Sequence, residues 1–598
     1  MKKQSTKKIK EIASYKDDTC DTPGIRILLF LASLVFFGVA PLLNFKPAYD
    51  YTIIKDVLGS LFIAIFAGVL YARRKDISIN LKGFIAGTVV FMYIIAGCFY
   101  APVKYGAAQI LENYLLYYLL FIVGMLWKWE KTDAFIWAAS MVVASITAFV
   151  QYHTTRYPIS TFGNPNFFAG HLLMPIFLSL YFIKKKHVSI AIIYGVITLS
   201  ALFIVKSRAA LFGFFIASAF ASFLMLKEHR IRWVKYIGFA IVGIVGICMF
   251  GPIKTQLTQD IRYYIWRGTW NLIQHKPFLG WGTGNFIFYY PYFRYREYFL
   301  RPQATPITNH PHCQYLEILS ENGFCGLMLF GALIVFALYC GLKKNSKDSD
   351  GIFLFASVGI IAVIVDNILS TNLTNTSTAM YFSFLVGLCF ATDENGKKIV
   401  ISRSWKTIMS LTMIFSMIAL GSWKVYYRLI PEVYLKQAIG ARERNDFVTA
   451  IENYEKVCKI NPNHVVSWYK LAFAYGQIGD LENSERIYLL INNKLFPHFA
   501  KTDANLGVLY IQKQDYEKAK YYYEKALFFN PYDIEVLLSM LSIKLYHDRD
   551  IKAAREYLKR VMAINPEHEY VKYLIKNFPE LMDNSIDNNK ETGIGKKN

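Results

Sequence analysis

The sequence predicts an all-α protein built from a polytopic membrane domain of about thirteen spans and a C-terminal α-solenoid. Hydrophobic residues make up 54% of the 598 residues and charged residues only 18%, whereas about a quarter of the residues in a soluble protein are charged. Apolar runs of about 20 residues, the length that crosses a bilayer, recur up to residue 425. From about residue 430 the chain becomes more polar and a repeat of 34–35 residues begins.

The apolar runs and the repeat divide the chain into successive segments. We expect a cytoplasmic N-tail at 1–24, a membrane domain at 25–425 with one long loop at 252–321, a repeat domain at 430–580 and a disordered tail at 581–598. The membrane spans are expected at residues 25–44, 53–71, 81–100, 108–127, 133–151, 165–183, 188–205, 208–226, 234–251, 322–342, 352–371, 374–391 and 406–425.

Lysine and arginine predict the orientation of these spans. Every second connection is basic, for example Arg73-Arg74-Lys75 and Lys184-Lys185-Lys186, and the lysine-rich N-tail belongs to the same set. Because basic connections stay in the cytoplasm, the N-terminus is expected inside and, after an odd number of spans, the C-terminus outside. The first span lacks a small-residue cleavage site and is typical of an uncleaved signal anchor. These clusters explain the net charge of +23, and no basic face interleaved with aromatics indicates nucleic-acid binding.

The C-terminal repeat has the tetratricopeptide pattern. Trp468-x-x-Leu471-Ala472-x-x-Tyr475 aligns with Leu506-Gly507-x-x-Tyr510. A small residue followed four positions later by a large one recurs at Ala450/Tyr454, Ser484/Tyr488, Ala519/Tyr523 and Ala554/Leu558, and prolines close the repeats at 462, 497, 531 and 566. This spacing predicts helical hairpins that stack into a solenoid.

Polar residues cluster where the predicted topology reaches the outside. Asn164 is a candidate N-cap and Pro165 suits the first turn of a helix, so free backbone amides of this helix, with Asn166, could receive an anion. The alternative is an ordinary capped membrane helix. Lys206 and Arg208 lie in the next outside turn, against the positive-inside bias, and Arg208 could grip a phosphate. The alternative is a pair of snorkelling anchors.

The long loop supplies the remaining candidates. Its aromatics, such as Trp281, suit sugar stacking or, equally, an interfacial belt. His312 is the best general base, because histidine titrates near neutral pH, although a loop histidine can also be structural. No third ligand accompanies His310 and His312, so no metal or cofactor is expected, and Cys313 and Cys325 are either a disulfide or, more simply, two thiols. Asp366, near the outer end of a span, is a weaker candidate because an acid at a helix end costs less than one at the bilayer centre.

Taken in order, these motifs resemble the O-antigen ligase/polymerase superfamily. The resemblance lies in Thr161-Phe162-Gly163-Asn164-Pro165-Asn166, Ser207-Arg208, Arg262…Trp266, Pro277-x-x-Gly280-x-Gly282-x-Gly284-Asn285-Phe286, His310-x-His312-x-x-Tyr315-Leu316 and Glu321-x-Gly323-x-x-Gly326. One departure is Cys313, where the family commonly has asparagine after the histidine, so any role of that asparagine is missing here.

The resemblance implies a GT-C-like fold in the bacterial inner membrane and a donor glycan on undecaprenyl diphosphate. It implies metal-independent, inverting transfer in which Arg208 and Arg262 hold the diphosphate and His312 activates the acceptor hydroxyl. The substrate-binding positions implied with them are Asn164, Asn166, Lys206, Arg267, Gly282, Gly284, His310, Tyr315 and Glu321. This chemistry agrees with cations placed to face developing negative charge.

The acceptor stays open at this point. A lipid A core sugar (lipopolysaccharide ligation), another repeat unit (polymerisation) and a protein hydroxyl all fit, and the repeats favour a protein partner in their groove. From a different class, the chain could be a non-catalytic membrane scaffold. A transporter is less favoured, because polar residues gather at the outer surface and not at the bilayer midplane.

Overall fold

The computed structural model describes residues 22–50, 52–73, 77–225, 260–345, 351–391 and 398–582. The chain forms two compact units. The membrane unit comprises the chain up to Gly251 together with His312–Ile430, and the repeat unit comprises Pro252–Pro311 together with the chain from Pro431. The long loop therefore groups with the repeats and not with the helices that precede and follow it. The predicted span 234–251, and most of the predicted N-tail and C-terminal tail, lie outside the described residues.

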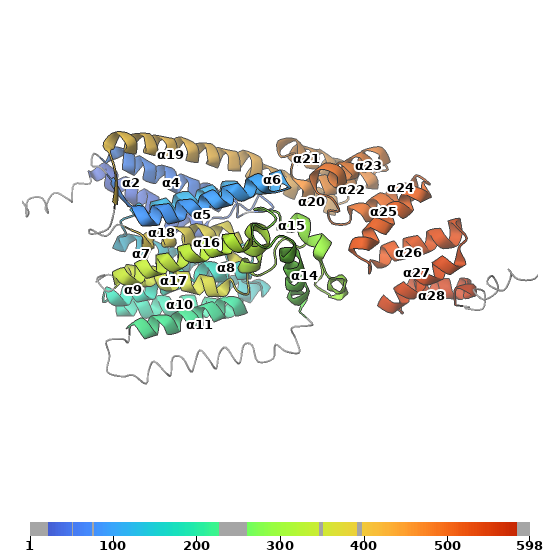
Figure 1. Ribbon diagram of the computed structural model, residues 1–598, viewed down its shortest axis with the longest axis horizontal. Coiled ribbons are helices and arrows are strands. Elements are labelled where there is room, and N and C mark those ends of the chain that lie inside the picture. Colours follow the sequence, from blue (N-terminus) through green and yellow to red (C-terminus); the bar gives the residue numbers. More distant parts are fainter. Residues whose placement is uncertain are drawn as a thin grey trace, which may run out of the picture. The chain divides into compact units, whose positions relative to one another are not determined.

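The membrane unit is a bundle of helices (Figure 1). Its elements are α2 (Pro23–Ser33), continued by the π-helix Leu34–Val39 and α3 (Ala40–Leu42), then α4 (Ile54–Ala72), α5 (Leu81–Tyr100), α6 (Lys104–Leu126), α7 (Lys131–Thr155), α8 (Pro165–Leu172), the 3₁₀ turn Pro175–Phe177, α9 (Leu178–Lys184), α10 (Val188–Val205), α11 (Arg208–Met225), α16 (Gln314–Asn345), α17 (Ile352–Asp366), the 3₁₀ turn Asn372–Thr374, α18 (Thr376–Cys389), α19 (Arg403–Lys424) and the π-helix Val425–Leu429. In the described part of the chain, ten helical runs are long and apolar enough to cross a membrane, and α17 and α18 are shorter apolar helices.

The all-α prediction is confirmed, with three local differences. The helix expected at 165–183 is interrupted before Pro175, which has no N–H to donate to the helix. Helix α16 begins at Gln314, eight residues before its expected start at 322, and is kinked at Gly323, whose φ is 65°. Helix α17 ends at Asp366 and not at 371, because buried polar side chains replace the helical hydrogen bonds there.

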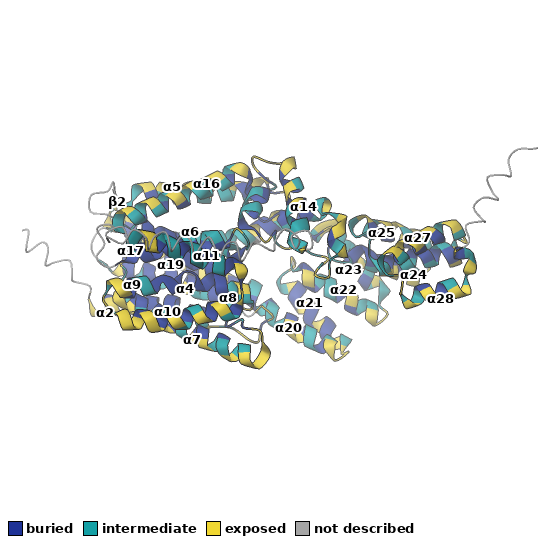
Figure 2. Ribbon diagram, turned by 90° about the horizontal axis from the view of Figure 1, so that it is seen from below, coloured by how far each residue is buried: buried dark blue, intermediate teal, exposed yellow. Residues whose placement is uncertain are grey.

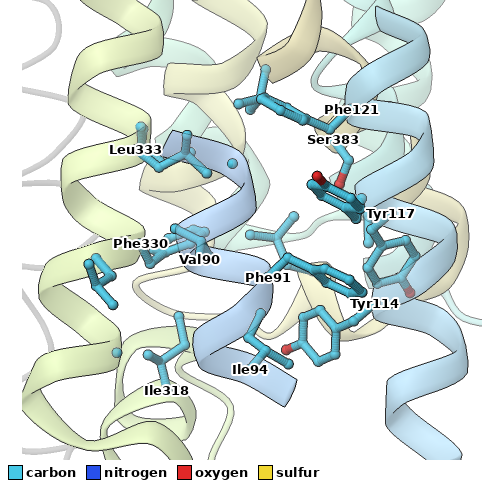
Figure 3. Close-up of a pocket in the computed structure, with 18 of the residues that line it drawn as sticks. Val90, Phe91, Ile94, Tyr114, Tyr117, Phe121, Ile318, Phe330, Leu333 and Ser383 are labelled. Atoms are coloured by element: carbon cyan, nitrogen blue, oxygen red, sulfur yellow. The ribbon is translucent and has the colours of Figure 1, made fainter. Parts of the chain in front are cut away.

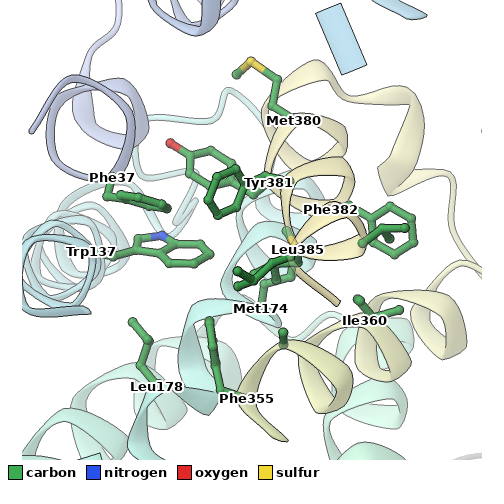
Figure 4. Packing of buried hydrophobic residues seen from close by; sticks show 14 of the residues in the cluster. Phe37, Trp137, Met174, Leu178, Phe355, Ile360, Met380, Tyr381, Phe382 and Leu385 are labelled. Atoms are coloured by element: carbon green, nitrogen blue, oxygen red, sulfur yellow. The ribbon is translucent and has the colours of Figure 1, made fainter. Parts of the chain in front are cut away.

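Aromatic residues and close-packed glycines form the core of this unit. Phe37, Trp137 and Tyr381 pack ring against ring in the centre, with the Phe37 and Trp137 centroids 5.2 Å apart (Figure 4). Helices α6 and α18 touch through Gly124 and Gly387, where a Cβ would overlap the backbone of the facing helix. Small residues at such contacts are typical of membrane helix pairs.

Exposed residues lie along the outward faces of the helices (Figure 2), and many of them are large and apolar. Phe99 is 78% exposed and Phe415 is 69% exposed. Helices that are apolar on both their buried and exposed faces suit a lipid environment.

One end of the bundle is basic. Lys344 donates to the Cys389 carbonyl, 3.1 Å away, and Lys406 donates to the carbonyl of Arg73. A short antiparallel pair, β1 (Ile77–Asn80) with β2 (Lys398–Ile401), closes this end. Because α16 and α17 run in opposite directions between Gln314 and Lys344 and between Ile352 and Asp366, their polar ends at Gln314 and Asp366 lie at the other end of the bundle.

The repeat unit contains a loop subdomain and an array of helical hairpins. The loop forms α14 (Ile261–His275), α15 (Phe286–Tyr289) and the 3₁₀ turns Tyr290–Phe293 and Arg296–Leu300. The array contains α20 (Ile430–Glu443), α21 (Phe447–Ile460), α22 (Val465–Gln477), α23 (Leu481–Leu490), the π-helix Ile491–Leu495, α24 (Thr502–Gln512), α25 (Tyr516–Phe529), α26 (Ile534–Ser542), the π-helix Ile543–His547, α27 (Ile551–Ile564), α28 (Glu569–Asn577) and the 3₁₀ turn Pro579–Leu581.

The residues that predicted the repeats form the contacts between their helices. A Cβ at Gly507 would overlap the ring of Tyr523, so the small residue allows α24 and α25 to approach closely. Ser484 donates to the Ala472 carbonyl, 2.8 Å away, at the equivalent place in the preceding hairpin. The second helices begin at aspartate caps, such as Asp515, whose carboxylate accepts the Lys518 N–H.

Candidate functional site

Helix α8 begins at the cap that the sequence predicts. The side chain of Asn164 accepts the Asn166 N–H at 2.8 Å, and Pro165 occupies the first turn. Asn164 is half-buried and Asn166 is exposed. The amides of this helix end therefore lie at the surface of the membrane unit.

A buried lysine stands beside the residues that lead into α8. Lys55, only 1% exposed, donates to the Pro41 carbonyl at 2.9 Å and to the Thr161 hydroxyl at 3.2 Å. Its ammonium lies 3.5 Å from the centroid of the Phe162 ring, a cation–π contact. Lys55 thus fixes the first two residues of the Thr161–Asn166 motif.

The turn between α10 and α11 presents two cations. Lys206 ends α10 in the left-handed region, with φ 57°, and Arg208 is the first residue of α11. Both side chains are exposed, whereas Ser207 between them is buried. A left-handed turn of this kind turns the chain sharply and presents both cations at the surface.

His312 lies in a backbone conformation that is rare for a side-chain-bearing residue. Its φ is 56°, and its side chain is exposed. Hydrogen bonds stabilise this turn, because the N–H of Gln314 donates to the carbonyls of Asn367 and Ser370, both at 3.0 Å. Such strain persists only where surrounding contacts hold it and is common at functional sites.

Asp366 is fully buried where this turn meets α17. Its carboxylate accepts the Ser370 hydroxyl at 2.8 Å and the Asn372 amide at 2.7 Å. The other carboxylate oxygen makes no hydrogen bond within the described part of the chain. Asp366 therefore organises the loop whose carbonyls hold the His312 turn.

The loop and the end of α17 contact the helices that begin near Asn164 and at Arg208. On α8, a Cβ at Gly170 would overlap the Asn372 amide, so the two are in direct contact. On α11, a Cβ at Gly213 would overlap the Ala362 carbonyl and reach within 3.3 Å of the Asp366 Cβ. Helices α8 and α11 and the turn that carries His312 thus pack around Asp366 and its loop.

Tyr315 and Glu321 lie on α16 and not in the loop where the sequence places them. The Tyr315 hydroxyl donates to the Ile364 carbonyl at 2.7 Å, which ties α16 to α17. Glu321 is buried, as is Glu317 one turn earlier, and both lie close enough to the Tyr114 hydroxyl to interact electrostatically. The structure therefore gives Tyr315 a positioning role and puts Glu321 inside the bundle.

A mostly apolar cavity of about 160 Å³ lies between α5, α6, α16 and α18. Figure 3 shows Phe91 and Tyr114 on one side of it and Ile318 and Phe330 on the other. Polar atoms gather where Gln314 and Asn322 join the lining, and the Asn322 carbonyl accepts the Tyr93 hydroxyl at 2.8 Å. Since Gln314 is two residues from His312, the cavity approaches the turn that carries the candidate base.

The loop residues proposed for substrate binding lie in the repeat unit. Arg262 is half-buried in the first turn of α14, which Asp260 caps. The guanidinium of Arg267 stacks over the Tyr295 ring, 4.2 Å from its centroid. Gly282 and Gly284 are buried with φ 93° and 74°. Other residues adopt this backbone conformation only with strain, so the main role of the two glycines is to form the turn.

A neighbouring arginine, Arg294, stabilises this loop. Arg294 is surrounded by the rings of Tyr290, Tyr298 and Phe299, and donates to the Pro306 carbonyl at 3.1 Å. Burial lowers the pKa of Arg294, and the tyrosines compensate for the lost hydration. His310 is half-buried, and the carbonyl of the next residue, Pro311, accepts the Trp266 indole N–H at 2.8 Å.

The predicted site residues thus divide between the units. Arg262, Arg267, Gly282, Gly284 and His310 belong to the repeat unit, and Asn164, Asn166, Lys206, Arg208, His312, Tyr315 and Glu321 to the membrane unit. Sequence reasoning overlooked Lys55 and Asn372 and undervalued Asp366. A lysine and an aspartate, Lys55-Asp56, within an apolar run were the available signal.

Within the described residues, no group of three histidine, cysteine, aspartate or glutamate side chains is placed to hold a metal ion. Cys313 and Cys325 are free thiols.

The fold and these sites define a multi-pass membrane protein that gathers cations, a histidine and a buried carboxylate at one end of its helix bundle and carries an array of helical repeats. The family model for O-antigen ligase matches residues 193–331, which contain every predicted site residue except Asn164 and Asn166. Models for the TPR repeat and the tetratricopeptide repeat match residues 441–479 and 504–532. The chain therefore carries an O-antigen ligase domain followed by C-terminal tetratricopeptide repeats, as its motifs predict.

No curated protein matches the chain significantly. Among solved structures, one titled crystal structure of APC/C hetero-tetramer Cut9-Hcn1 is 14% identical and covers 79% of this chain and 94% of its own, with a TM-score of 0.24. A similarity with so low a TM-score supports no conclusion about this chain. The O-antigen ligase domain supports membrane glycan transfer of the ligase or polymerase type, with glycan and lipid substrates.

Proposed function

We propose that the protein transfers a glycan from undecaprenyl diphosphate to a hydroxyl acceptor on the outer face of the bacterial inner membrane. The acceptor oxygen forms a bond to the anomeric carbon while the bond from that carbon to the diphosphate breaks. The diphosphate leaves with the electron pair, the acceptor proton goes to a base, and the configuration at the anomeric carbon inverts. The activated donor supplies the driving force, so the reaction requires no cofactor.

The convergence on Asp366 is the observation that carries this proposal. Asn164, Arg208 and His312 are up to 148 positions apart in the sequence, yet the helices and the turn that carry them pack against Asp366, the end of α17 or the loop that follows it. We take this packing of three motif-bearing segments around one buried carboxylate as favouring a built site over a scaffold.

Each residue then has a chemical role. His312 accepts the acceptor proton, because imidazole is a competent base near neutral pH. Arg208 stabilises the charge that develops on the leaving diphosphate, with Lys206 and the α8 amides as further groups for the anion. The same role is proposed for Arg262 from its motif alone. The guanidinium of Arg267 packs on the Tyr295 ring, so its main role is to stabilise the loop, and substrate binding is secondary.

The apolar cavity supports a lipid-linked donor. Its rings and aliphatic side chains, among them Phe91, Ile318 and Phe330, suit part of a polyprenyl tail, since burial of apolar surface requires only a matching apolar wall. The polar rim at Gln314 leads from this cavity toward His312.

The orientation follows from charge. The basic end of the bundle, with Lys344 and Lys406, lies away from Asp366 and His312. We infer by the positive-inside rule that the basic end is cytoplasmic, which favours an extracytoplasmic candidate site.

Three acceptors fit this chemistry: a lipid A core sugar, another repeat unit and a protein hydroxyl. The repeats are typical protein-binding modules, which favours a protein acceptor or partner. A non-catalytic scaffold is the remaining alternative, and one experiment separates it from the enzyme.

The experiment is a transfer assay with purified full-length protein, lipid-linked glycan and each class of acceptor. We expect His312→Ala to reduce transfer by at least about 10²-fold, the scale of a general base, and Arg208→Ala to slow it comparably through lost charge stabilisation. His153→Ala and Arg156→Ala are matched controls, since both residues are exposed at the end of α7.

Two further outcomes decide against the proposal. Equal effects of the control and site substitutions would show a general loss of folding. Transfer that survives both His312→Ala and Arg208→Ala, or no transfer to any acceptor by the wild-type protein, would remove the enzymatic role.

A further inference from the structure

The repeat array already contacts one segment of its own chain. The ring of Phe288 lies 4.5 Å from that of Phe496, and Tyr292 lies 5.3 Å from Phe529. Phe288 and Phe496 are both buried. The loop that contains Arg262 therefore packs on the array around the end of α25 and the segment before α24, and both belong to one compact unit.

A second hollow of the array lies further toward its C-terminal end. It has a volume of about 740 Å³ and is lined by residues of α24, α25, α26, the π-helix Ile543–His547 and α28. Most of the lining comes from the first helices of successive hairpins, the side on which solenoids form their concave surface. We call it the tyrosine groove, after Tyr516, Tyr523, Tyr546 and Tyr570 in its lining.

The tyrosine groove is aromatic and hydroxylated, and the one histidine in its described lining, His547, is paired with Asp548 at 2.9 Å. Its twelve described lining residues include four tyrosines, two serines and a glutamine, but no lysine, arginine, aspartate or glutamate. Tyr546 is 50% exposed, and the hydroxyls of Ser542 and Tyr570 lie 3.4 Å apart. Rings and hydroxyls are thus both available to a ligand.

The charges that surround the groove are already paired with one another. Asp548 binds Lys544 at 2.8 Å and Lys520 at 3.2 Å, and the latter also pairs with Glu517 at 2.7 Å. A carboxylate or phosphate ligand requires unpaired cations, and the lining offers none within the described residues. The groove therefore disfavours an acidic glycan or the C-terminal carboxylate of a peptide.

An uncharged glycan satisfies all of these features. A sugar ring has an apolar C–H face that packs on an aromatic ring, and hydroxyls at its edge that exchange hydrogen bonds with tyrosine, serine and glutamine. Tyrosine supplies both kinds of contact with few rotatable bonds, so little entropy is lost on binding.

We infer that the tyrosine groove binds a segment of an uncharged glycan chain, and so holds acceptor or product glycan in the unit that contains the Arg262 loop. This inference rests on the proposed function only in taking glycan as the substrate. It assigns the array two roles: the segment around Phe496 supports the chain's own loop, and the groove around Tyr546 retains the sugar.

The test is binding of full-length protein in detergent to a panel of neutral, acidic and amino-sugar oligosaccharides and of peptides with free C-termini. We expect neutral oligosaccharides to bind, and Tyr546→Ala/Tyr570→Ala to weaken that binding at least tenfold. Tyr546→Phe keeps the ring and should retain most of it. Tyr521→Ala removes a tyrosine that is 52% exposed on α25 but absent from the lining, and should have no effect.

The outcomes separate this inference from the proposed function. His312→Ala should abolish transfer and leave oligosaccharide binding intact, so loss of transfer alone does not bear on the groove. Neutral oligosaccharides that fail to bind, or that bind the double variant as tightly as wild type, would overturn the inference. Peptide binding that depends on Tyr546 and Tyr570, without glycan binding, would overturn it in favour of a protein ligand.

Discussion

Asp366 is a buried carboxylate whose observed hydrogen bonds come from neutral groups. The hydroxyl of Ser370 and the amides of Asn372 and Asn367 surround it. Burying such a group is costly unless hydrogen bonds hold it, and the loop around it supports His312 through Gln314. We therefore regard Asp366 as a positioning residue for the candidate base.

We predict that Asp366→Asn lowers kcat at least about tenfold. The new amide oxygen could keep the bonds from Ser370 and Asn372, but the amide NH₂ would replace the buried oxygen that has no hydrogen-bond partner in the described part of the chain, and would leave buried donors unsatisfied. The KM for the lipid-linked donor should change little, since the donor contacts lie on other residues. Ser370→Ala removes a single hydrogen bond, worth about 1 kcal/mol, and should have a smaller effect. Wild-type kcat in Asp366→Asn, with correct insertion, would contradict the positioning role.

Glycine contacts test the packing that brings the site together. Gly213→Ala should destabilise the protein by about 1–3 kcal/mol, the cost of overpacking, because the new methyl group would overlap the Ala362 carbonyl. Gly195→Ala on α10 is the matched control, since no atom lies within 4 Å of a Cβ placed there. Thermal unfolding in detergent measures both, and a melting temperature for Gly213→Ala equal to that of Gly195→Ala would argue against the tight contact.

At the scale of elements, the termini of the helices decide what the protein presents to its surroundings. Helices α17 and α18 are shorter than the span lengths predicted for them, and the residues between them form the polar loop around Asp366. Helix α16 begins early and takes Tyr315 and Glu321 into the bundle. In the array, caps and ion pairs fix the turns between helices.

Asp548, in the turn before α27, gives a pH-dependent prediction. Hydrogen bonds from Lys544 and His547 hold the pKa of Asp548 below its ordinary value. Because the pKa of Asp548 is lower in the folded protein than in the unfolded chain, its charged carboxylate stabilises the fold, by about 1 kcal/mol for a partly exposed pair. This stabilisation is present at neutral pH and is lost as the pH falls below about 4.

Hydrogen exchange of residues 543–551 measures this effect. Asp548→Asn should exchange faster than wild type at pH 7, and the difference should persist down to about pH 4 and shrink as the pH falls further. Glu556→Gln breaks an exposed pair with Lys559 and serves as the control. A difference that stays constant with pH would show that the charge of Asp548 is not its cause.

At the scale of the whole molecule, the loop and the repeats act as one unit. The loop leaves the membrane domain in the sequence between α11 and α16, yet its aromatic residues pack on the array. Because the loop contains Arg262, the array has a role in supporting a residue proposed for catalysis. The repeat array therefore has a structural role within its own chain.

We predict that Phe496→Ala releases the loop. Removal of a buried phenylalanine costs about 3–5 kcal/mol, and here it removes the contact with Phe288. Exchange protection of residues 286–293 should fall and transfer should slow, while the array stays folded. Phe473→Ala, at a residue that is 39% exposed on α22, should change neither, and an unchanged loop in Phe496→Ala would refute the coupling.

The sequence allowed much of this fold to be predicted, because lipid and repeat stacking both leave periodic patterns. Bilayer thickness requires runs of about 20 apolar residues, and these located every described span. The close approach of Gly507 to Tyr523 recurs at each hairpin as a small residue opposite a large one, so the repeats could also be predicted from the sequence. The early start of α16 could not be predicted, because Gln314 and Glu317 are polar and their burial depends on contacts with other segments of the chain.

The candidate site was only partly predictable for the same reason. His312 and Arg208 stood out by residue type and by position on the predicted topology. Lys55 and Asn372 did not, because a single polar residue in an apolar run gives no indication of what it faces. Lys55 contacts Thr161, 106 positions away, and Asn372 contacts Gly170 on α8 as well as the nearby Asp366.

The sequence by itself determined the membrane class, the repeat array and the identity of the residues proposed for catalysis, because each depends on local composition and spacing. Tertiary structure alone decided that Asp366 joins the motifs of α8, α11 and the His312 turn, and that the loop belongs with the repeats. Those contacts depend on which surfaces pack together in three dimensions, and a one-dimensional pattern of hydropathy does not contain that information.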